Sequence, residues 1–163
     1  AATFSALKYI FLDIQGGVDD APVKAVTEMP YLEFNDNKNQ RSRWTLFVPD
    51  DWITGTNVNI DIFWSPETGA AGNVFWFTEA KSIAVGTSVS GANMTATLVQ
   101  AAPGVAYRLM STGSSLLISG ASMAAGNLIQ AVMGRSGQAA TDTYGGNVLV
   151  HHVRIEYMAK KLL

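Results

Sequence analysis

The chain has 163 residues, of which 48% are hydrophobic and 15% are charged, so it can bury the core of one domain and is not generally disordered. The net charge of −2 favours neither nucleic acid nor an anionic membrane as a partner. The absence of cysteine excludes disulfides and thiol chemistry. No basic stretch precedes the first apolar run, so we expect no signal peptide.

The first 28 residues are expected to form an N-terminal arm or an added strand outside the main domain. Residues 7–14 are strongly apolar and predict a strand, and residues 23–27 predict a short extended piece. A segment this apolar does not stay in water. We therefore expect residues 7–14 to be ordered on a sheet edge, on a neighbouring subunit or on the surface of a larger assembly. A plain edge strand of the same sheet is the alternative.

Two strands are predicted next, over residues 31–34 and 42–48, with a loop rich in Asn and Asp between them. Lys38, Arg41 and Arg43 are close together in this part of the sequence. Three positive charges with an acidic residue among them are too few to form the basic surface that usually binds nucleic acid. We interpret them as part of a solvated loop.

Residues 57–81 carry the clearest strand pattern of the chain. Apolar and polar residues alternate on both sides of a loop rich in Pro and Gly, which predicts a long β-hairpin with an extended connection. Phe75 and Phe77 point to the opposite face from Trp76 in such a strand. Aromatic residues on both faces indicate that the outer face is covered as well, by another subunit or by a docking partner.

Charge is scarce in the middle of the chain, where Arg108 and Arg135 are the only charged residues between residues 82 and 141. The uncharged run of residues 109–134 is long enough to cross a membrane as a helix. Its glycines and its Ser, Thr, Asn and Gln residues exclude that and predict short strands instead. A charge-poor surface of this extent indicates that much of it faces protein.

The chain closes with a predicted flexible loop over residues 134–146 and a strand over residues 147–157. Strict alternation assigns one face of that strand to Leu149, His151, Val153, Ile155 and Tyr157. About eight short strands without a long helix predict an all-β antiparallel sandwich. We expect an arm over residues 1–28, the sandwich over residues 29–158 and a tail over residues 159–163.

No catalytic, cofactor or metal site is expected. The glycine-rich motifs that cradle nucleotides and the GxSxG motif of hydrolases are absent. His151 and His152 are the only histidines, and adjacent residues of a strand point to opposite faces and cannot share a metal. His151 is assigned to the core or an interface and His152 to the surface. A hydrolase would need two acids in one cleft, and nothing singles out such a pair.

Several segments in order resemble the jelly-roll domain of tailed-bacteriophage virion proteins. They are MPYLEFND at residues 29–36, RWTLFVP at 43–49, VNIDIFWS at 58–65, GNVFW at 72–76, AAPG at 101–104 and VRIEY at 153–157. The resemblance covers roughly residues 29–157 and contains no catalytic signature. It implies a jelly-roll fold of the kind found in capsid decoration proteins, head fibres and tail or receptor-binding proteins.

The function expected from this resemblance is that of a non-enzymatic virion structural protein, a trimeric decoration or cement protein that stabilises the head shell. Its partners would be two further copies of itself and the major capsid protein, without nucleic acid, membrane or cofactor. It would be made in the host cytoplasm and lie on the phage head surface. The expected oligomer or capsid interface consists of Leu7, Tyr9, Phe11, Phe75 and Phe77.

The alternative is a carbohydrate- or receptor-binding jelly roll of a tail or head fibre. A sugar platform needs exposed aromatic side chains near loops. The candidates are Trp52, Trp64 and Tyr144.

Overall fold

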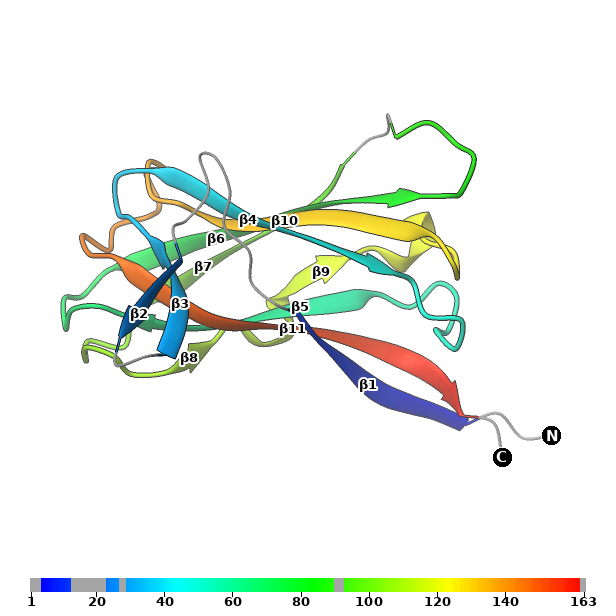
Figure 1. The fold of residues 1–163 in the computed structure, drawn as a ribbon. Helices are drawn as coiled ribbons and strands as arrows, with labels where there is room; N and C mark the ends of the chain where they lie inside the picture. The colour runs from blue at the N-terminus through cyan, green and yellow to red at the C-terminus, as the bar shows by residue number, and fades with distance from the viewer. Residues whose placement is uncertain (1–3, 13–22, 27–28, 90–92, 162–163) are drawn as a thin grey trace.

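Two antiparallel sheets face each other across a single core in a computed structural model that describes residues 4–12, 23–26, 29–89 and 93–161 (Figure 1). The larger sheet contains β1 (Phe4–Leu12), β2 (Val23–Val26), β3 (Met29–Phe34), β5 (Val58–Pro66), β8 (Met110–Ser111), β9 (Leu116–Ile118) and β11 (Val148–Lys161). The smaller sheet contains β4 (Asn39–Phe47), β6 (Asn73–Ile83), β7 (Met94–Ala101) and β10 (Leu128–Ser136). Two short 3₁₀ turns, Gly113–Ser115 and Gly120–Ser122, complete the regular structure of these ranges.

The strand order is that of a jelly roll. The larger sheet runs β3-β11-β5-β8 and the smaller sheet runs β4-β10-β6-β7, so the chain crosses between the sheets after β3, β4, β5, β7, β9 and β10. β8 and β9 pair with different parts of β5 and act as one interrupted edge strand. The predicted all-β jelly-roll sandwich is thus confirmed. Within the described ranges, no helix is long and apolar enough to cross a membrane.

The predicted hairpin over residues 57–81 is wrong, because β5 and β6 lie in opposite sheets. β5 pairs with β11, β8 and β9, whereas β6 pairs with β10 and β7. The inner faces of the two strands carry Trp64 and Trp76, whose rings meet across the core with centroids 5.5 Å apart. The loop between the two strands is long enough for the crossing, and the crossing lets both indoles fill the space between the facing sheets.

A β-bulge at His151 changes the faces that were predicted for β11. The register with β5 shifts between Val150 and His152, so one extra residue is inserted there. The residues of β11 that belong to the core are Val148, Val150, Val153, Ile155, Tyr157 and Ala159. The core residues have even numbers up to Val150 and odd numbers from Val153 onward. The bulge between them lets the apolar residues on both sides of it face the core. His151 is therefore exposed and His152 half-buried, the reverse of the expectation.

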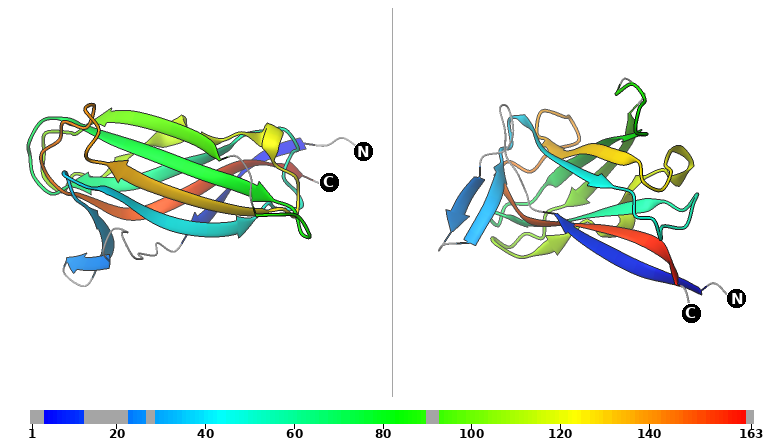
Figure 2. Two further views of the ribbon diagram at one scale, coloured as in Figure 1. Left: turned by 90° about the horizontal axis from the view of Figure 1, so that it is seen from above. Right: turned by 45° about the vertical axis from the view of Figure 1, so that its right-hand side comes forward.

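Strand β1 lies along the second half of β11, from Phe4 opposite Lys161 to Leu12 opposite Val153. The apolar segment expected over residues 7–14 is thus an edge strand of its own chain, and residues 13–14 lie outside the described residues. The expected tail over residues 159–163 is strand as far as Lys161. The two strands extend beyond the smaller sheet as a ribbon that ends near both chain termini (Figures 1 and 2). β2 pairs with β3 at the opposite end of this sheet edge.

The loop between β10 and β11 is anchored by a buried ion pair, which corrects the expectation of a flexible loop. Arg135 Nε and Nη2 donate to Asp142 Oδ2 and Oδ1 at 2.9 and 2.7 Å. The remaining donors reach the carbonyls of Phe34, Tyr144 and Gly146 at 3.3, 2.5 and 2.6 Å. All five guanidinium hydrogens therefore have acceptors in a fully buried position, which holds the loop against the sandwich.

The neighbouring loop after β5 is fixed to the same structure. The Tyr144 hydroxyl donates to the carbonyl of Thr68 at 3.0 Å and accepts from the Thr68 backbone N–H at 3.0 Å. Gly72 lies so close to this loop that a Cβ atom at its position would stand 2.6 Å from the carbonyl oxygen of Thr143. Glycine is needed there because the two backbones touch.

Candidate binding surfaces

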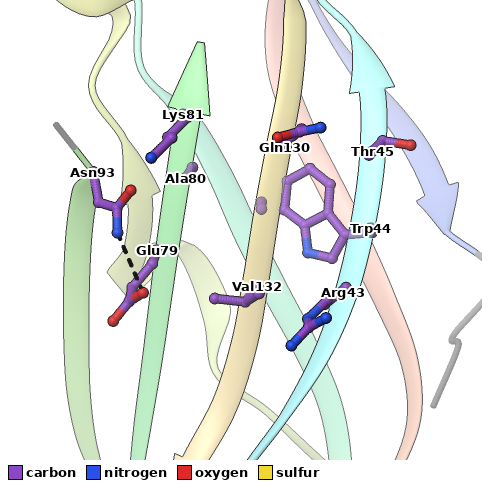
Figure 3. Close-up of a pocket in the computed structure, with 10 residues that line it drawn as sticks. Arg43, Trp44, Thr45, Glu79, Ala80, Lys81, Asn93, Gln130 and Val132 are labelled. Carbon is purple, nitrogen blue, oxygen red and sulfur yellow. Dashed lines mark hydrogen bonds between the residues drawn. The ribbon is translucent and has the colours of Figure 1, made fainter. Parts of the chain in front are cut away.

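A shallow groove crosses the outer face of the smaller sheet, and we call it the sheet groove. It has a volume of about 340 Å³. Its lining residues are Arg43, Trp44, Thr45, Glu79, Ala80, Lys81, Asn93, Gln130, Ala131 and Val132 (Figure 3). β4, β10 and β6 place these side chains, together with Asn93 just before β7.

The groove follows β10 because that central strand presents shorter side chains than its neighbours. Val132 lies between Arg43 on β4 and Glu79 on β6. The next outward position of β10, Gly134, has no side chain, and it lies between Arg41 and Phe77. Strands in a sheet are about 4.8 Å apart, so the two walls of the groove stand roughly 10 Å apart at the backbone.

The tip of the Phe77 ring lies at the gap left by Gly134. A Cβ atom at residue 134 would stand 2.6 Å from the Phe77 Cζ and 2.2 Å from the Gln40 carbonyl oxygen, so only glycine fits. The Arg41 guanidinium lies 5.8 Å from the centroid of the Phe77 ring, within cation–π range. A second hollow of about 290 Å³ contains Phe75 and Phe77 and shares Glu79 with the sheet groove. The placement of Phe75 and Phe77 opposite the buried Trp76 agrees with the alternation in the sequence.

The outer face of the ribbon formed by β1 and β11 carries a second surface, the ribbon patch, made of Leu7, Tyr9 and Met158. Leu7 and Tyr9 are 45% and 44% exposed, and Met158 stands opposite Leu7 in the ladder. The Arg154 guanidinium beside them lies 4.8 Å from the Tyr9 ring centroid. The backbone of Phe11 lies opposite Arg154, and its side chain is outside the described residues.

An ion pair between Lys8 and Asp51 ties the ribbon to the loop that follows β4. Their hydrogen bond and mutual attraction raise the pKa of Lys8, and the hydrogen bond with Lys8 lowers the pKa of Asp51. A raised Lys pKa favours the folded state at low pH and a lowered Asp pKa favours it at high pH. The tether therefore contributes between the ordinary pKa of the carboxyl and that of the ammonium group, 3.8 and 10.5.

A third surface lies in the loop between β7 and β8, at the end of the sandwich opposite the ribbon (Figure 1). Val105, Tyr107 and Leu109 are each more than half exposed, and we call them the apolar loop. The backbone N–H of Tyr107 donates to the carbonyl of Pro66 at 2.7 Å, which holds the loop against the end of β5. Tyr107 has a φ of 58°, a value that non-glycine residues adopt only at a cost.

The predicted glycan platform does not exist at the residues proposed for it. Trp52 and Trp64 are 0% exposed and Tyr144 is 1% exposed, so none of them can stack on a ligand. Trp52 lies under the ribbon, where its backbone bridges to Ala159. Large aromatic residues near loops are more often anchors for those loops than exposed platforms, and these three are anchors.

The predicted interface residues fall on two opposite faces. Leu7 and Tyr9 lie on the outer face of the larger sheet, whereas Phe75 and Phe77 are half-buried on the outer face of the smaller one. A single contact surface cannot include both pairs, because the sandwich lies between them. The apolar loop and Lys81 were not singled out from sequence, since exposure and convergence are tertiary properties. Arg43 was assigned to a solvated loop, whereas it lies in strand β4.

The described acids are mostly engaged in structural contacts. Asp61 Oδ1 accepts from Ser111 and from the Gly113 backbone at 2.6 and 2.9 Å, and its Oδ2 accepts from Arg154 at 2.8 Å. Among the described residues, no group of three or more His, Asp or Glu side chains could hold a metal ion. His151 Nε2 lies 2.8 Å from the Ser65 hydroxyl, and burial lowers the pKa of this histidine.

No protein-family model and no curated protein matches the sequence. The chain is similar in structure to a CBM35 module of Cellvibrio japonicus Abf62, with a TM-score of 0.46, 10% identity and coverage of 93% of this chain and 92% of the other. A family 11 carbohydrate-binding module of Clostridium thermocellum has a TM-score of 0.42 and 9% identity, with 94% and 86% covered. A protein of infectious bursal disease virus, Gx strain, has a TM-score of 0.39 and 10% identity, with 96% of this chain and 40% of the viral chain covered. These are distant similarities of architecture, and the fold class of this chain follows from its own two sheets, which make it an all-β jelly-roll sandwich.

Proposed function

We propose that this chain is a non-enzymatic structural protein of a phage virion, which decorates the head as a trimer. The observation that carries the proposal is the ribbon patch, which leaves Leu7 and Tyr9 nearly half exposed on a two-stranded extension of the sandwich. Covering apolar side chains at such a place with another protein is favourable, by about 25 cal/mol for each Å² of apolar surface removed from water. The resemblance to virion jelly rolls supports the same role.

A decoration protein needs one surface for its own copies and another for the shell. The ribbon patch and the apolar loop lie at opposite ends of the sandwich, so both can be covered at once (Figure 1). We assign the ribbon patch to contacts within the trimer and the apolar loop to the major capsid protein. Each trimer would then stabilise the head by adding buried contact area at a junction between capsid subunits.

Replacing the ribbon patch by charge should dissociate the trimer. For the pair Leu7→Asp and Tyr9→Asp, we expect light scattering at micromolar concentration to fall from three times the 17.4 kDa chain mass to the mass of one chain. The physical reason is that burying an unpaired carboxylate at an interface costs several kcal/mol. Val85→Asp, in an exposed loop, is the matched control and should leave the mass unchanged. A wild-type chain that is already monomeric would contradict the trimer.

The position and copy number of the chain in purified phage particles would decide between head and tail. The alternative function, a carbohydrate- or receptor-binding module, needs a surface other than the buried Trp52, Trp64 and Tyr144. The sheet groove is an exposed hollow that could serve as this binding surface.

A further inference from the structure

We propose that the sheet groove binds an acidic saccharide, meaning a sugar chain that carries carboxylate or phosphate groups. The proposal rests on the alternative function above, for which it supplies a site and a class of ligand, and it does not depend on assembly or capsid attachment. A volume of about 340 Å³ lies within the range of about 300–1,000 Å³ typical of small-molecule sites.

The charge of the groove is opposite to that of the whole chain. Arg43 and Lys81 stand at opposite walls, and Arg41, which lines the neighbouring hollow, precedes Arg43 by two residues on the same face of β4. Glu79 is the one acid among the residues that line the two hollows of this face. Three cations against one anion, in a chain of net charge −2, make this face locally attractive to anions.

Arg43 and Lys81 are free to bind. Within the described part of the chain, neither side chain has an ion pair or a hydrogen bond, whereas Arg135, Arg154 and Lys8 are each paired with an aspartate. Glu79 does not neutralise Arg43, because Val132 lies between them in the ladder. Unpaired guanidinium and ammonium groups can donate charge-assisted hydrogen bonds to a carboxylate or a phosphate without first breaking a bond within the protein.

The other groups of the groove suit a sugar. Gln130, Asn93 and Thr45 offer neutral donors and acceptors, and Glu79 accepts hydrogen bonds from hydroxyl groups. Figure 3 shows Gln130 on β10, Glu79 on β6 and Asn93 on one side of β4, with the Asn93 amide toward Glu79. The ring of Phe77, with the Arg41 guanidinium over it, adds apolar surface beside the groove.

Two other occupants fit less well. A nucleic acid strand is held by a row of phosphate contacts, and three cations next to an acid make a small footprint for it. A folded protein would need a contact area of about 1,200 Å² or more, and a recessed polar groove is a poor centre for such an interface.

The test measures binding of four polymers to the purified full chain by isothermal titration calorimetry at low salt. Polygalacturonate carries carboxylates, poly(glycerol phosphate) carries phosphates, dextran is neutral, and oligo-dT represents nucleic acid. We expect binding of one or both of the first two, and the stronger one identifies the acidic group. The affinity should fall as salt is raised, because exposed charges are screened.

The decisive variant is Arg43→Gln with Lys81→Gln, and its matched control is Lys38→Gln with Arg108→Gln, which removes two exposed positive charges outside the groove. We expect the groove variant to lose affinity at least about tenfold, which corresponds to about 1.4 kcal/mol, and the control to stay within about twofold. Both variants should keep the wild-type melting temperature, because the substituted side chains make no contacts that hold the fold.

Several results would overturn the inference. They are no binding of either acidic polymer, equal binding of dextran, tighter binding of oligo-dT, or equal losses in the groove variant and the control. Light scattering of the groove variant separates this inference from the proposed function. A groove variant that still forms trimers but no longer binds the acidic polymer would support both, and a wild-type trimer that binds no polymer would remove the inference alone.

Discussion

Replacing Arg135 by methionine should destabilise the chain by about 3–5 kcal/mol, the cost of breaking a buried ion pair by removing one partner. Asp142 is as deeply buried as Arg135 and would keep only the backbone N–H of Phe75, which donates to its Oδ2 at 2.9 Å. The carbonyls of Tyr144 and Gly146 would also lose their donors. Because the free energy of unfolding of a domain is about 5–15 kcal/mol, this single change would remove a large share of the stability of the chain.

Urea unfolding followed by tryptophan fluorescence measures the effect. Arg108→Met is the matched control, since Arg108 is exposed, and we expect it to change the free energy of unfolding by less than about 0.5 kcal/mol. The pair Arg135→Met with Asp142→Leu should cost less than Arg135→Met alone, because no unpaired charge stays buried. A cost below about 1 kcal/mol for Arg135→Met would show that the ion pair does not anchor the loop.

A chain shortened to begin at Thr27 should fold but fail to form trimers. The jelly-roll strands β3–β11 all remain, so the sandwich keeps its core. The lost contacts are the ladders of β1 with β11 and of β2 with β3, the half-buried Ile10 and the tether from Lys8 to Asp51. Burying an isoleucine contributes about 1.5–3 kcal/mol, so we expect the free energy of unfolding to fall by about 2–4 kcal/mol.

The shortened chain is measured by urea unfolding and by light scattering beside the full chain. Its β11 would expose an unpaired edge from Val153 to Lys161, which favours aggregation, so low protein concentration is needed. A shortened chain that trimerises like the full chain would exclude the ribbon from assembly. A shortened chain that does not fold would show that β1 is an integral part of the core rather than an addition to it.

Local patterns were sufficient for most of the strands. The alternation around Trp76 placed its indole and the Phe77 ring on opposite faces, and the structure agrees. Alternation is a local property, because successive side chains of any strand point to opposite faces. The same patterns identified an all-β sandwich without a long helix and indicated that the apolar segment around Leu7 would be ordered as a strand.

Pairing between strands was decided only by the tertiary structure. Nothing local distinguishes a hairpin of β5 and β6 from a crossing between sheets, because both satisfy the same alternation. The crossing follows from the partners of the two strands, β11 for β5 and β10 for β6. The bulge at His151 likewise depends on β5, whose register forces one extra residue out of the ladder.

The features of the candidate sites were likewise determined partly by the local sequence and partly by the tertiary structure. Composition and alternation by themselves determined that this chain is a β-sandwich with few charged residues and without an evident catalytic motif. Burial of Trp52, Trp64 and Tyr144, exposure of the ribbon patch, and convergence of Arg43 and Lys81 on one groove were decided by the packing of distant segments. The physical reason is that the exposure of a side chain depends on which other strands cover it, and those strands are up to a hundred residues away in sequence.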